Sequence, residues 1–451
     1  MTQTGEKKSW KVGTLTYTTG GLVGLFAWLL WGDFAWAIKE RAVSPIVQLM
    51  LREFKSSDFI NGLLLGTLPA ALYMFLGPIV SLKSDRHRGK LGRRIPFLLF
   101  PTPIAALALI ALAFTPFFGS WLHETLGENS PGLNQSRVIC FGVLWGIFEI
   151  ATVIANSVYN GLINDVVPQP LLGRFFGLFR AFSLAAGILF NFWLIKYAEA
   201  HYKWIFISIG VLYGAGFMLM CYKVKEGEYP PPDDKQEGLN FWSNAKEYIR
   251  ECFSSPFYVW VFIACTVSAM AFMPFNLFSV FYAKSINMSM ATYGKIVAMN
   301  FAISLCIAYL LGYLADRFHP LRVGMAVILF YGIMTLWAGH YATTVPAFIV
   351  AMSCHNVISG MWFTGTASLA LRLFPQAKFA QYAAAMGILM SVATMATGPS
   401  VGKILDITGH NYRFTFILGS VLAFAGFIAV VILHKKFMRL GGPKGYVPPE
   451  I

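Results

Sequence analysis

Residues 138–160 read VICFGVLWGIFEIATVIANSVYN, an apolar run that is interrupted near its centre by Glu149. A hydrocarbon core of about 30 Å requires roughly 20 apolar residues in a helix. Because lipid offers no partners to stray backbone groups, such a run adopts a helical conformation. The segment therefore predicts a membrane-spanning helix that carries an ionisable group at mid-depth.

Eleven other runs of the same kind fill most of the 451 residues. These runs do not alternate polar and apolar residues, which argues against a transmembrane β-barrel. The sequence predicts an all-α polytopic membrane protein with twelve transmembrane helices. Besides residues 138–160, the predicted spans are 14–48, 59–82, 95–115, 174–197, 204–222, 256–283, 291–314, 322–340, 346–369, 379–402 and 412–434.

The composition agrees with a membrane protein, since 57% of the residues are hydrophobic and only 12% are charged. Soluble domains carry about 25% charged residues, so an ordinary soluble enzyme and a disordered chain are excluded. The formal charge of +14 fits basic cytoplasmic loops better than nucleic-acid binding. The six cysteines form no CxxC pair, and no HExxH or Walker motif is present. We therefore expect no cofactor, no metal site and no enzymatic activity.

The distribution of basic residues predicts the orientation. When the N-terminus is placed inside, about two thirds of the 35 Lys and Arg fall on the inner side. Both termini are therefore expected in the cytoplasm, and the first span is expected to act as an uncleaved signal. The compact loops favour a bacterial inner membrane, and we expect a monomer.

A polar linker over residues 223–255 divides the chain into two sets of six spans. It contains the run Pro230-Pro231-Pro232, which is typical of a solvated spacer. The apolar side chains after that run recur at helical spacing, which predicts an amphipathic helix on the inner membrane surface. These side chains are Phe241, Trp242, Ala245, Tyr248, Ile249 and Cys252. The predicted domains are a bundle over 1–222, the linker, a bundle over 256–434 and a tail over 435–451.

The two halves repeat each other. Ser84-Asp85-Arg86 closes the second span, and Ala315-Asp316-Arg317 closes the eighth. Two pseudo-symmetric six-helix bundles form a transporter architecture in which the substrate is held between the repeats.

The loop over residues 84–97, SDRHRGKLGRRIPF, resembles the loop between helices two and three of the major facilitator superfamily. Its form is similar to that of the glycoside–pentoside–hexuronide:cation symporters and the related sucrose transporters. The stretch 312–317, GYLADR, resembles the repeat of this motif in the second half. The resemblance implies a twelve-helix secondary transporter that works by alternating access.

The same loop predicts a cytoplasmic gate. The eleventh span begins on the inner side, so the positive end of its helix dipole attracts the Asp85 carboxylate. Asp316 is expected to act in the same way at the start of the fifth span, near Arg174. The basic residues would tie the loops to acids or lipid phosphates. The predicted gate comprises Asp85, Arg86, Arg93, Arg94, Arg174, Asp316 and Arg317.

Charged groups inside the membrane mark the candidate substrate site, because a carboxylate there costs about 2.5–3.5 kcal/mol. Glu149 has Trp145 one turn earlier, and Asp33 has Trp36 nearly one turn later. The internal repeat sets Asn356, beside His355, at the depth of Glu149. His355 is a candidate proton carrier because its unperturbed pKa lies near 6.5. Further polar or aromatic candidates at mid-span are Asn156, Arg180, Asn276 and Trp362.

Carboxylates that accept hydrogen bonds, together with aromatic faces, suit a sugar. In the symporter family, acidic residues on helices one and four are implicated in sugar binding, which the resemblance transfers to Asp33 and Glu149. The sodium-coupled members also carry an acidic pair on helix two. Here that span has only Asp58 at its outer edge, so a coupling proton is expected rather than sodium. The alternatives are an exporter of amphipathic drugs or metabolites, and a non-transporting sensor or a pigment or lipid delivery factor.

Overall fold

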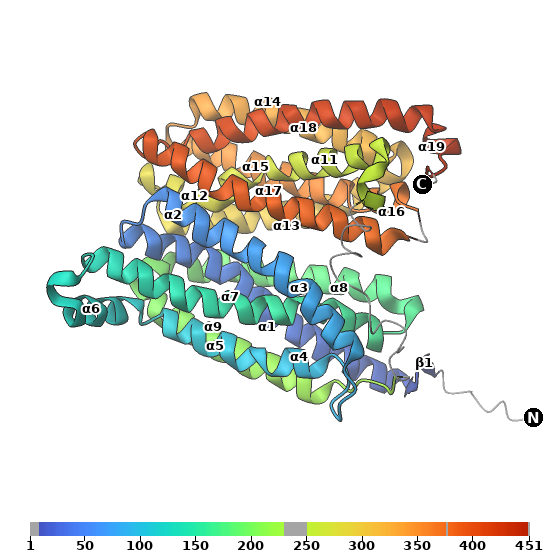
Figure 1. Cartoon of the computed structure of the whole chain (residues 1–451), viewed down its shortest axis with the longest axis horizontal. Helices are drawn as coiled ribbons and strands as arrows, with labels where there is room; N and C mark the ends of the chain where they lie inside the picture. Colours follow the sequence, from blue (N-terminus) through green and yellow to red (C-terminus); the bar gives the residue numbers. More distant parts are fainter. Residues whose placement is uncertain (1–8, 230–249, 376–377, 450–451) are drawn as a thin grey trace, which may run out of the picture. The chain divides into compact units, whose positions relative to one another are not determined.

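The computed structural model describes residues 9–229, 250–375 and 378–449. Nearly all of this chain is helical, as the sequence predicts, with one two-stranded hairpin near its start (Figure 1). Residue contacts divide the chain into two units. The first unit comprises residues 1–56 and 72–233, and the second comprises residues 57–71 and 234–451. Residues 57–71, which include the first half of the predicted second span, therefore pack with the second half of the sequence.

The first unit is a helical bundle whose long members are α1, α3, α5, α7, α8 and α9. Within it α1 packs against α8 and α9, and α5 packs against α7 and α9. Its elements are β1 (Trp10–Val12), β2 (Leu15–Tyr17), α1 (Thr19–Glu53), α3 (Leu68–Arg86), α4 (Ile95–Leu99), α5 (Pro101–Leu112), α6 (Thr115–Leu126), η2 (Gly127–Asn129), α7 (Leu133–Val166), η3 (Gln169–Leu171), α8 (Leu172–Leu189), η4 (Phe190–Leu194), η5 (Ile195–Tyr197) and α9 (Ala198–Lys223).

The second unit is a further bundle, to which the short helix α2 and the π-helical turn η1 contribute from the first half of the sequence. Within it α14 packs on α15 and α18, and α13 packs on α15. Its elements are α2 (Asp58–Gly62), η1 (Leu63–Thr67), α11 (Pro256–Met270), α12 (Met273–Ser285), α13 (Met290–Phe318), α14 (Pro320–Tyr341), α15 (Val345–Gly365), α16 (Leu369–Leu373), α17 (Phe379–Ile407), α18 (Phe414–Arg439) and α19 (Gly442–Gly445).

The helices account for the predicted spans. Among the described residues, 11 helical runs are long and apolar enough to cross a bilayer. The run from Gln169 to Lys223 has 55 residues, more than twice the length that one crossing needs. His201 leaves the helical conformation within this run (φ −133°), so the run contains the predicted fifth and sixth spans.

The start of the first span is a correction to the sequence prediction. Residues 10–17 form a β-hairpin that turns at Gly13 (φ +55°), whereas the predicted helix begins at residue 14. The helix begins only at Thr19, after the Thr18 hydroxyl accepts the N–H of Gly21 at 3.2 Å. Val12 and Leu15 alternate with polar neighbours, which is the periodicity of a strand.

Residues 115–126 begin at the last residue of the predicted span 95–115 and continue outside the predicted spans. They form α6, which packs on α7. Pro116 occupies the first helical turn, a position that favours the start of a helix. The predicted amphipathic helix in the linker lies mostly outside the described residues, although residues 250–254 are helical.

His319 shapes the connection between α13 and α14. Its backbone is left-handed (φ +74°), and its Nδ1 atom accepts the N–H of Leu321 at 3.3 Å. Its ring stacks on Phe437 with a centroid distance of 4.6 Å. The side chain therefore combines a helix cap with aromatic packing.

The environment of His319 predicts a pH-dependent stability. Burial, followed by the positive charges of Arg372, Arg322 and His434, lowers the pKa of His319 to about 4. An unfolded histidine binds its proton near pH 6.5, so the folded state loses stability as the pH falls from about 6.5 to 4. We expect His319→Asn, which keeps an acceptor and tolerates left-handed backbone, to flatten the pH dependence of the melting temperature in this window. Equal slopes for variant and wild type would contradict this assignment.

Candidate functional site

The centre of α1 carries charged side chains that interact with charges on two other helices of the first unit. Three acids and three bases take part, so the group is electrically balanced when all six are ionised. We call it the α1 charge cluster: Asp33, Lys39, Glu40 and Arg41 on α1, Glu149 on α7 and Arg180 on α8. The cluster joins three residues that the sequence predicts for the substrate site: Asp33, Glu149 and Arg180.

Glu40 and Arg41 lie well inside α1. The helix continues to Glu53, 13 residues beyond Glu40. At 1.5 Å per residue, Glu40 lies about 20 Å from the end of α1. Arg41 interacts electrostatically with Glu40, Arg180 and Asp33, so it belongs to the cluster rather than to the helix end.

Lys39 is the most deeply buried base of the cluster, with 1% of its surface exposed. Its Nζ atom lies 3.5 Å from the Trp36 ring centroid, 4.8 Å from that of Tyr213 and 5.5 Å from that of Phe148. Among the described residues this ammonium has no hydrogen-bond partner. Aromatic faces attract a cation by about 2 kcal/mol when water is excluded, which is less than the cost of burying a charge. The acids of the cluster, above all Glu40 and Glu149, supply the remaining compensation.

The sequence analysis missed Lys39. The signal was present, since Lys39 follows Trp36 by three residues and therefore shares its helix face.

The two acids that the sequence predicts for substrate binding are placed differently. Asp33 is 2% exposed, and within the described chain its Oδ2 atom accepts no hydrogen bond. Glu149 is only half-buried. An unsatisfied buried carboxylate oxygen is costly, so Asp33 depends on the basic side chains of the cluster. Of the two acids, Glu149 has the larger exposed surface.

Two of the tryptophans predicted for the site, Trp36 and Trp145, are packed into the interior of the first unit. Trp36 stacks on Tyr159 with a centroid distance of 6.2 Å, and Lys39 occupies a face of its ring. Trp145 stacks on Phe148 at 5.3 Å. Asn156, also on α7, is exposed. The polar groups of α7 therefore offer more accessible surface than the two indole rings.

In the second unit, His355 and Asn276 form one hydrogen-bonded group. His355 is fully buried, and its Nε2 lies 2.9 Å from Asn276 Oδ1. Its Nδ1 lies 2.8 Å from the Tyr331 hydroxyl. Because an amide oxygen only accepts, Nε2 carries the proton and Nδ1 accepts from the tyrosine. Both ring nitrogens are thus satisfied, which favours a structural role over proton transfer.

The other two candidates of the second unit flank this group. Trp362 is buried against Phe272, with a centroid distance of 6.4 Å. Asn356 is half-buried beside His355 on α15. The structure thus gathers Asn276, His355 and Trp362 around one aromatic interior.

The basic loop between α3 and α4 is held by Asp165 at the end of α7. Its carboxylate accepts hydrogen bonds from Arg93 Nε and Nη2 at 2.9 and 2.6 Å, and from Arg94 Nε at 3.1 Å. Burial alone would lower the pKa of Arg93, but its hydrogen bonds and attraction to Asp165 raise that pKa overall. Arg94 also pairs with Asp85 at 2.6 Å. Asp85 therefore has a partner within its own unit.

Glu226, at the start of the linker, caps the helix that follows this loop. Its carboxylate accepts the backbone N–H groups of Arg93, Arg94 and Ile95 at 3.1, 2.8 and 2.7 Å. An acid at a helix N-terminus satisfies otherwise unpaired donors and complements the helix dipole. The sequence analysis missed both Asp165 and Glu226, which lie 71 and 132 residues from Arg94.

The remaining gate residues lie at helix ends of their own units. Asp316 pairs with Arg372 at 2.5 Å, and Arg317 Nη1 lies 3.4 Å from the Tyr313 hydroxyl. Arg86 and Arg174 are exposed on α3 and α8. Arg372, which the sequence analysis did not select, is thus the partner of Asp316 within its own unit.

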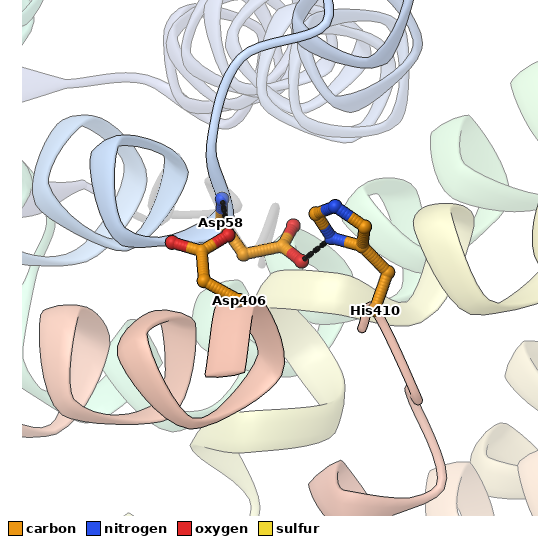
Figure 2. A group of neighbouring side chains, drawn as sticks. All are labelled: Asp58, Asp406 and His410. Atoms are coloured by element: carbon orange, nitrogen blue, oxygen red, sulfur yellow. Dashed lines mark hydrogen bonds and ion pairs between the residues drawn. The ribbon is translucent and has the colours of Figure 1, made fainter. Parts of the chain in front are cut away.

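Asp58, Asp406 and His410 form a hydrogen-bonded cluster in the second unit (Figure 2). Asp406 accepts the backbone N–H groups of Asp58 and Phe59 at 2.8 and 3.0 Å and so caps α2. Asp58 is 1% exposed, and its carboxylate accepts from His410 Nδ1 at 2.7 Å and from the Tyr412 hydroxyl at 3.2 Å. The geometry could offer three ligand atoms, but each carboxylate oxygen already accepts a hydrogen bond. The cluster therefore holds α2 against α17.

Three glycines bring these two elements into contact, and we call the region the α2–α17 junction: Asp58, Gly62, Gly398, Gly402 and Asp406. A Cβ atom at Gly402 would overlap the Asp58 carbonyl oxygen, and one at Gly62 would overlap that of Gly398. Small residues at such spacing allow two membrane helices to approach closely. Because its residues are more than 300 positions apart, the junction could not be read from the sequence.

A family model of the Major Facilitator Superfamily matches residues 29–396 and 262–444. A bacterial homologue of the human lysosomal transporter Spinster, in an inward-facing occupied conformation, matches at 13% identity, over 93% of this chain and 97% of that chain, with a TM-score of 0.65. The nucleoside transporter NupG matches at 11% identity, over 92% and 98%, with a TM-score of 0.61. A D-xylose–proton symporter matches at 16% identity, over 92% and 96%, with a TM-score of 0.61.

Identities this low establish a shared fold and leave the substrate open. The family match, by contrast, spans most of the chain, including the α1 charge cluster and the helices of both units. The protein is a member of the Major Facilitator Superfamily.

Proposed function

We propose that this chain is a secondary active transporter that moves a sugar or glycoside by alternating access, as a proton symporter. The proposal places it in the glycoside–pentoside–hexuronide and sucrose branch of the superfamily, in a bacterial inner membrane with both termini in the cytoplasm. The observation that carries it is the α1 charge cluster. Six ionisable groups on spanning helices are costly, and such groups mark substrate or proton pathways.

The chemistry of the cluster suits a polyhydroxylated solute. Glu149 is half-buried, and Asn156 and Arg180 are exposed, so together they offer acceptors and donors to hydroxyl groups. Lys39 and Asp33 lie deeper and set the local charge. We assign sugar contact to Glu149, Asn156 and Arg180, and electrostatic support to the two buried residues.

The balance of charges gives a route to coupling. Protonation of Glu149 leaves the cluster with one excess positive charge. This charge changes the free-energy cost for the carrier to pass through an occluded state. Symport follows only if the proton and the sugar prefer the same conformation. His355 is a weaker candidate for the proton because both of its ring nitrogens are already engaged.

Uptake of labelled solutes into cells tests the substrate and the coupling. The panel contains a pentose, a hexose, a glycoside, a nucleoside and a hydrophobic cation, each with and without an imposed pH gradient. We expect gradient-dependent uptake of a sugar or glycoside, and a loss of at least tenfold in Glu149→Gln. Glu124→Gln, at an exposed acid of α6, is the matched control. Export of the cation alone, or sugar uptake indifferent to the gradient, would contradict the proposal.

We also propose that Asp85 latches the cytoplasmic side by exchanging Arg94 for the helix end of α17 during the cycle. Asp85 has 51% of its side chain exposed, whereas Asp165 has only 13% exposed and receives three guanidinium hydrogen bonds. The two acids therefore differ in how firmly they are held.

This difference predicts opposite phenotypes for two conservative variants. Asp165→Asn should lower the stability by about 2 kcal/mol, because charge-assisted hydrogen bonds are lost in a partly buried site. Asp85→Asn should lower transport at unchanged membrane abundance and cost less than about 1 kcal/mol, as exposed ion pairs do. Melting temperature and uptake are measured for both. Wild-type uptake in Asp85→Asn would remove the latch.

A further inference from the structure

A cavity of about 440 Å³ opens between the start of α14 and the end of α18. The two helices pack along each other (Figure 1). The cavity is lined by Met325, Val431, His434, Lys435, Met438 and Arg439. The lining combines apolar side chains with the cationic Lys435 and Arg439, and no acidic side chain is among the lining residues. The cavity belongs to the second unit, whereas the α1 charge cluster belongs to the first.

The surroundings of the cavity are electropositive as well. Arg322, at the first turn of α14, is exposed and reaches Met438 with its Nη2 atom 3.8 Å from the sulfur. The nearby acid Asp316 is already paired with Arg372. After burial, the charges of Arg372, Arg322 and His434 also lower the pKa of His319.

The depth of the cavity matches a lipid headgroup. Helix α18 has 26 residues and spans about 39 Å, whereas a hydrocarbon core is about 30 Å thick. The last turns, which carry Lys435 and Arg439, therefore extend to the depth of the headgroups. The distribution of basic residues assigns this end to the inner leaflet, where anionic lipids attract Lys and Arg.

We propose that this cavity binds the headgroup of an anionic phospholipid. Arg439 and Lys435 contact the phosphate, Arg439 through its planar pair of donors. The acyl chain lies along Met325 and Val431, which supply an apolar and adaptable surface. Basic pockets between transmembrane helices are a recurring form of lipid site. The proposal is independent of the transported substrate, because it concerns lipid binding at the surface of the second unit.

Titration of the delipidated protein in detergent tests the site. Phosphatidylglycerol and phosphatidylcholine are compared by native mass spectrometry and by the shift in melting temperature. The test variant is Lys435→Gln/Arg439→Gln. The control, Lys295→Gln/Lys403→Gln, removes two exposed lysines elsewhere in the same unit. If each basic side chain contributes about fivefold to the affinity for the anionic lipid, the test variant should bind that lipid about 25-fold more weakly. The control should change by less than about twofold.

Three outcomes would overturn the proposal. The first is equal binding of phosphatidylcholine and phosphatidylglycerol. The second is an unchanged affinity in Lys435→Gln/Arg439→Gln when its melting temperature without added lipid equals that of the wild type. If the variant melts lower than the wild type, Arg439→Gln alone replaces it: a loss of about fivefold in affinity then supports the site, and a change no larger than that of the control overturns it. The third is binding of glycerol phosphate as tight as that of the lipid, which would assign the site to a soluble phosphate.

Discussion

Lys39→Met is expected to destabilise the protein by about 3 kcal/mol, because removing one partner from a buried charge group leaves the others uncompensated. Lys39 has only 1% of its surface exposed. Without its ammonium the cluster would retain three acids and two bases. The double variant Lys39→Met/Glu149→Gln removes one charge of each sign and should recover most of the lost stability. The double variant should not transport, because Glu149 is the proposed sugar contact. Thermal melting in detergent and uptake in proteoliposomes separate the two effects.

A matched control exists for the lysine. Lys203 also lies over an aromatic ring, with its Nζ atom 4.5 Å from the Phe114 centroid, but it is exposed. Lys203→Met should change the melting temperature little, since exposed charges contribute about 1 kcal/mol or less. If Lys39→Met and the double variant melt at the same low temperature, Lys39 acts through packing alone and the charge balance is wrong.

Gly402→Leu is expected to disrupt the α2–α17 junction, with a cost of about 3 kcal/mol or more. A side chain at this position would overlap the Asp58 carbonyl oxygen, so α2 and α17 must separate. Separation also breaks the hydrogen bonds from the Asp58 and Phe59 N–H groups to Asp406. We expect a lowered melting temperature and a loss of transport. The Asp58→Asn variant should show a smaller decrease, since it keeps the backbone contacts.

The control for this prediction lies on the same helix. Gly387 is also part of α17, but a Cβ atom there would meet nothing within 4 Å. Gly387→Leu should therefore retain both stability and transport. If it is as harmful as Gly402→Leu, the effect comes from enlarging glycines on α17 in general, and the close approach at Gly402 does not explain it.

The spans could be predicted because hydropathy acts locally. A window of 18 or more apolar residues specifies a crossing helix without knowledge of its neighbours. The hairpin around Gly13 and the helix α6 lie outside such windows, so hydropathy gave no signal for them. The start of the first helix was consequently placed five residues early.

The site was predictable only in part, for the same physical reason. Asp33, Glu149 and Arg180 stand out because charge is rare in apolar spans. Their convergence with Lys39 and Arg41 depends on how α1, α7 and α8 pack, which single-helix periodicity does not contain. The pairing of Asp58 with His410, 352 residues away, is likewise a property of packing.

The role of the tryptophans illustrates a further limit. A tryptophan one turn from an acid is compatible both with a sugar platform and with an interior aromatic contact. Lys39 occupies a face of Trp36, and Phe148 stacks on Trp145. A sugar platform and an interior aromatic contact are compatible with the same sequence spacing. Only the residues packed against each ring distinguish the two roles.

The proposed transport site requires that Glu149 faces water within the protein, and labelling of single cysteines tests this most directly. Glu149→Cys and Ile147→Cys are made in a chain whose six native cysteines have been replaced. Ile147 is exposed on the same helix two residues away and is expected to face lipid, where a reactive thiolate does not form. A water-soluble, membrane-impermeant thiol reagent should label Glu149→Cys and leave Ile147→Cys unlabelled. Failure to label Glu149→Cys would contradict an aqueous substrate path along α7.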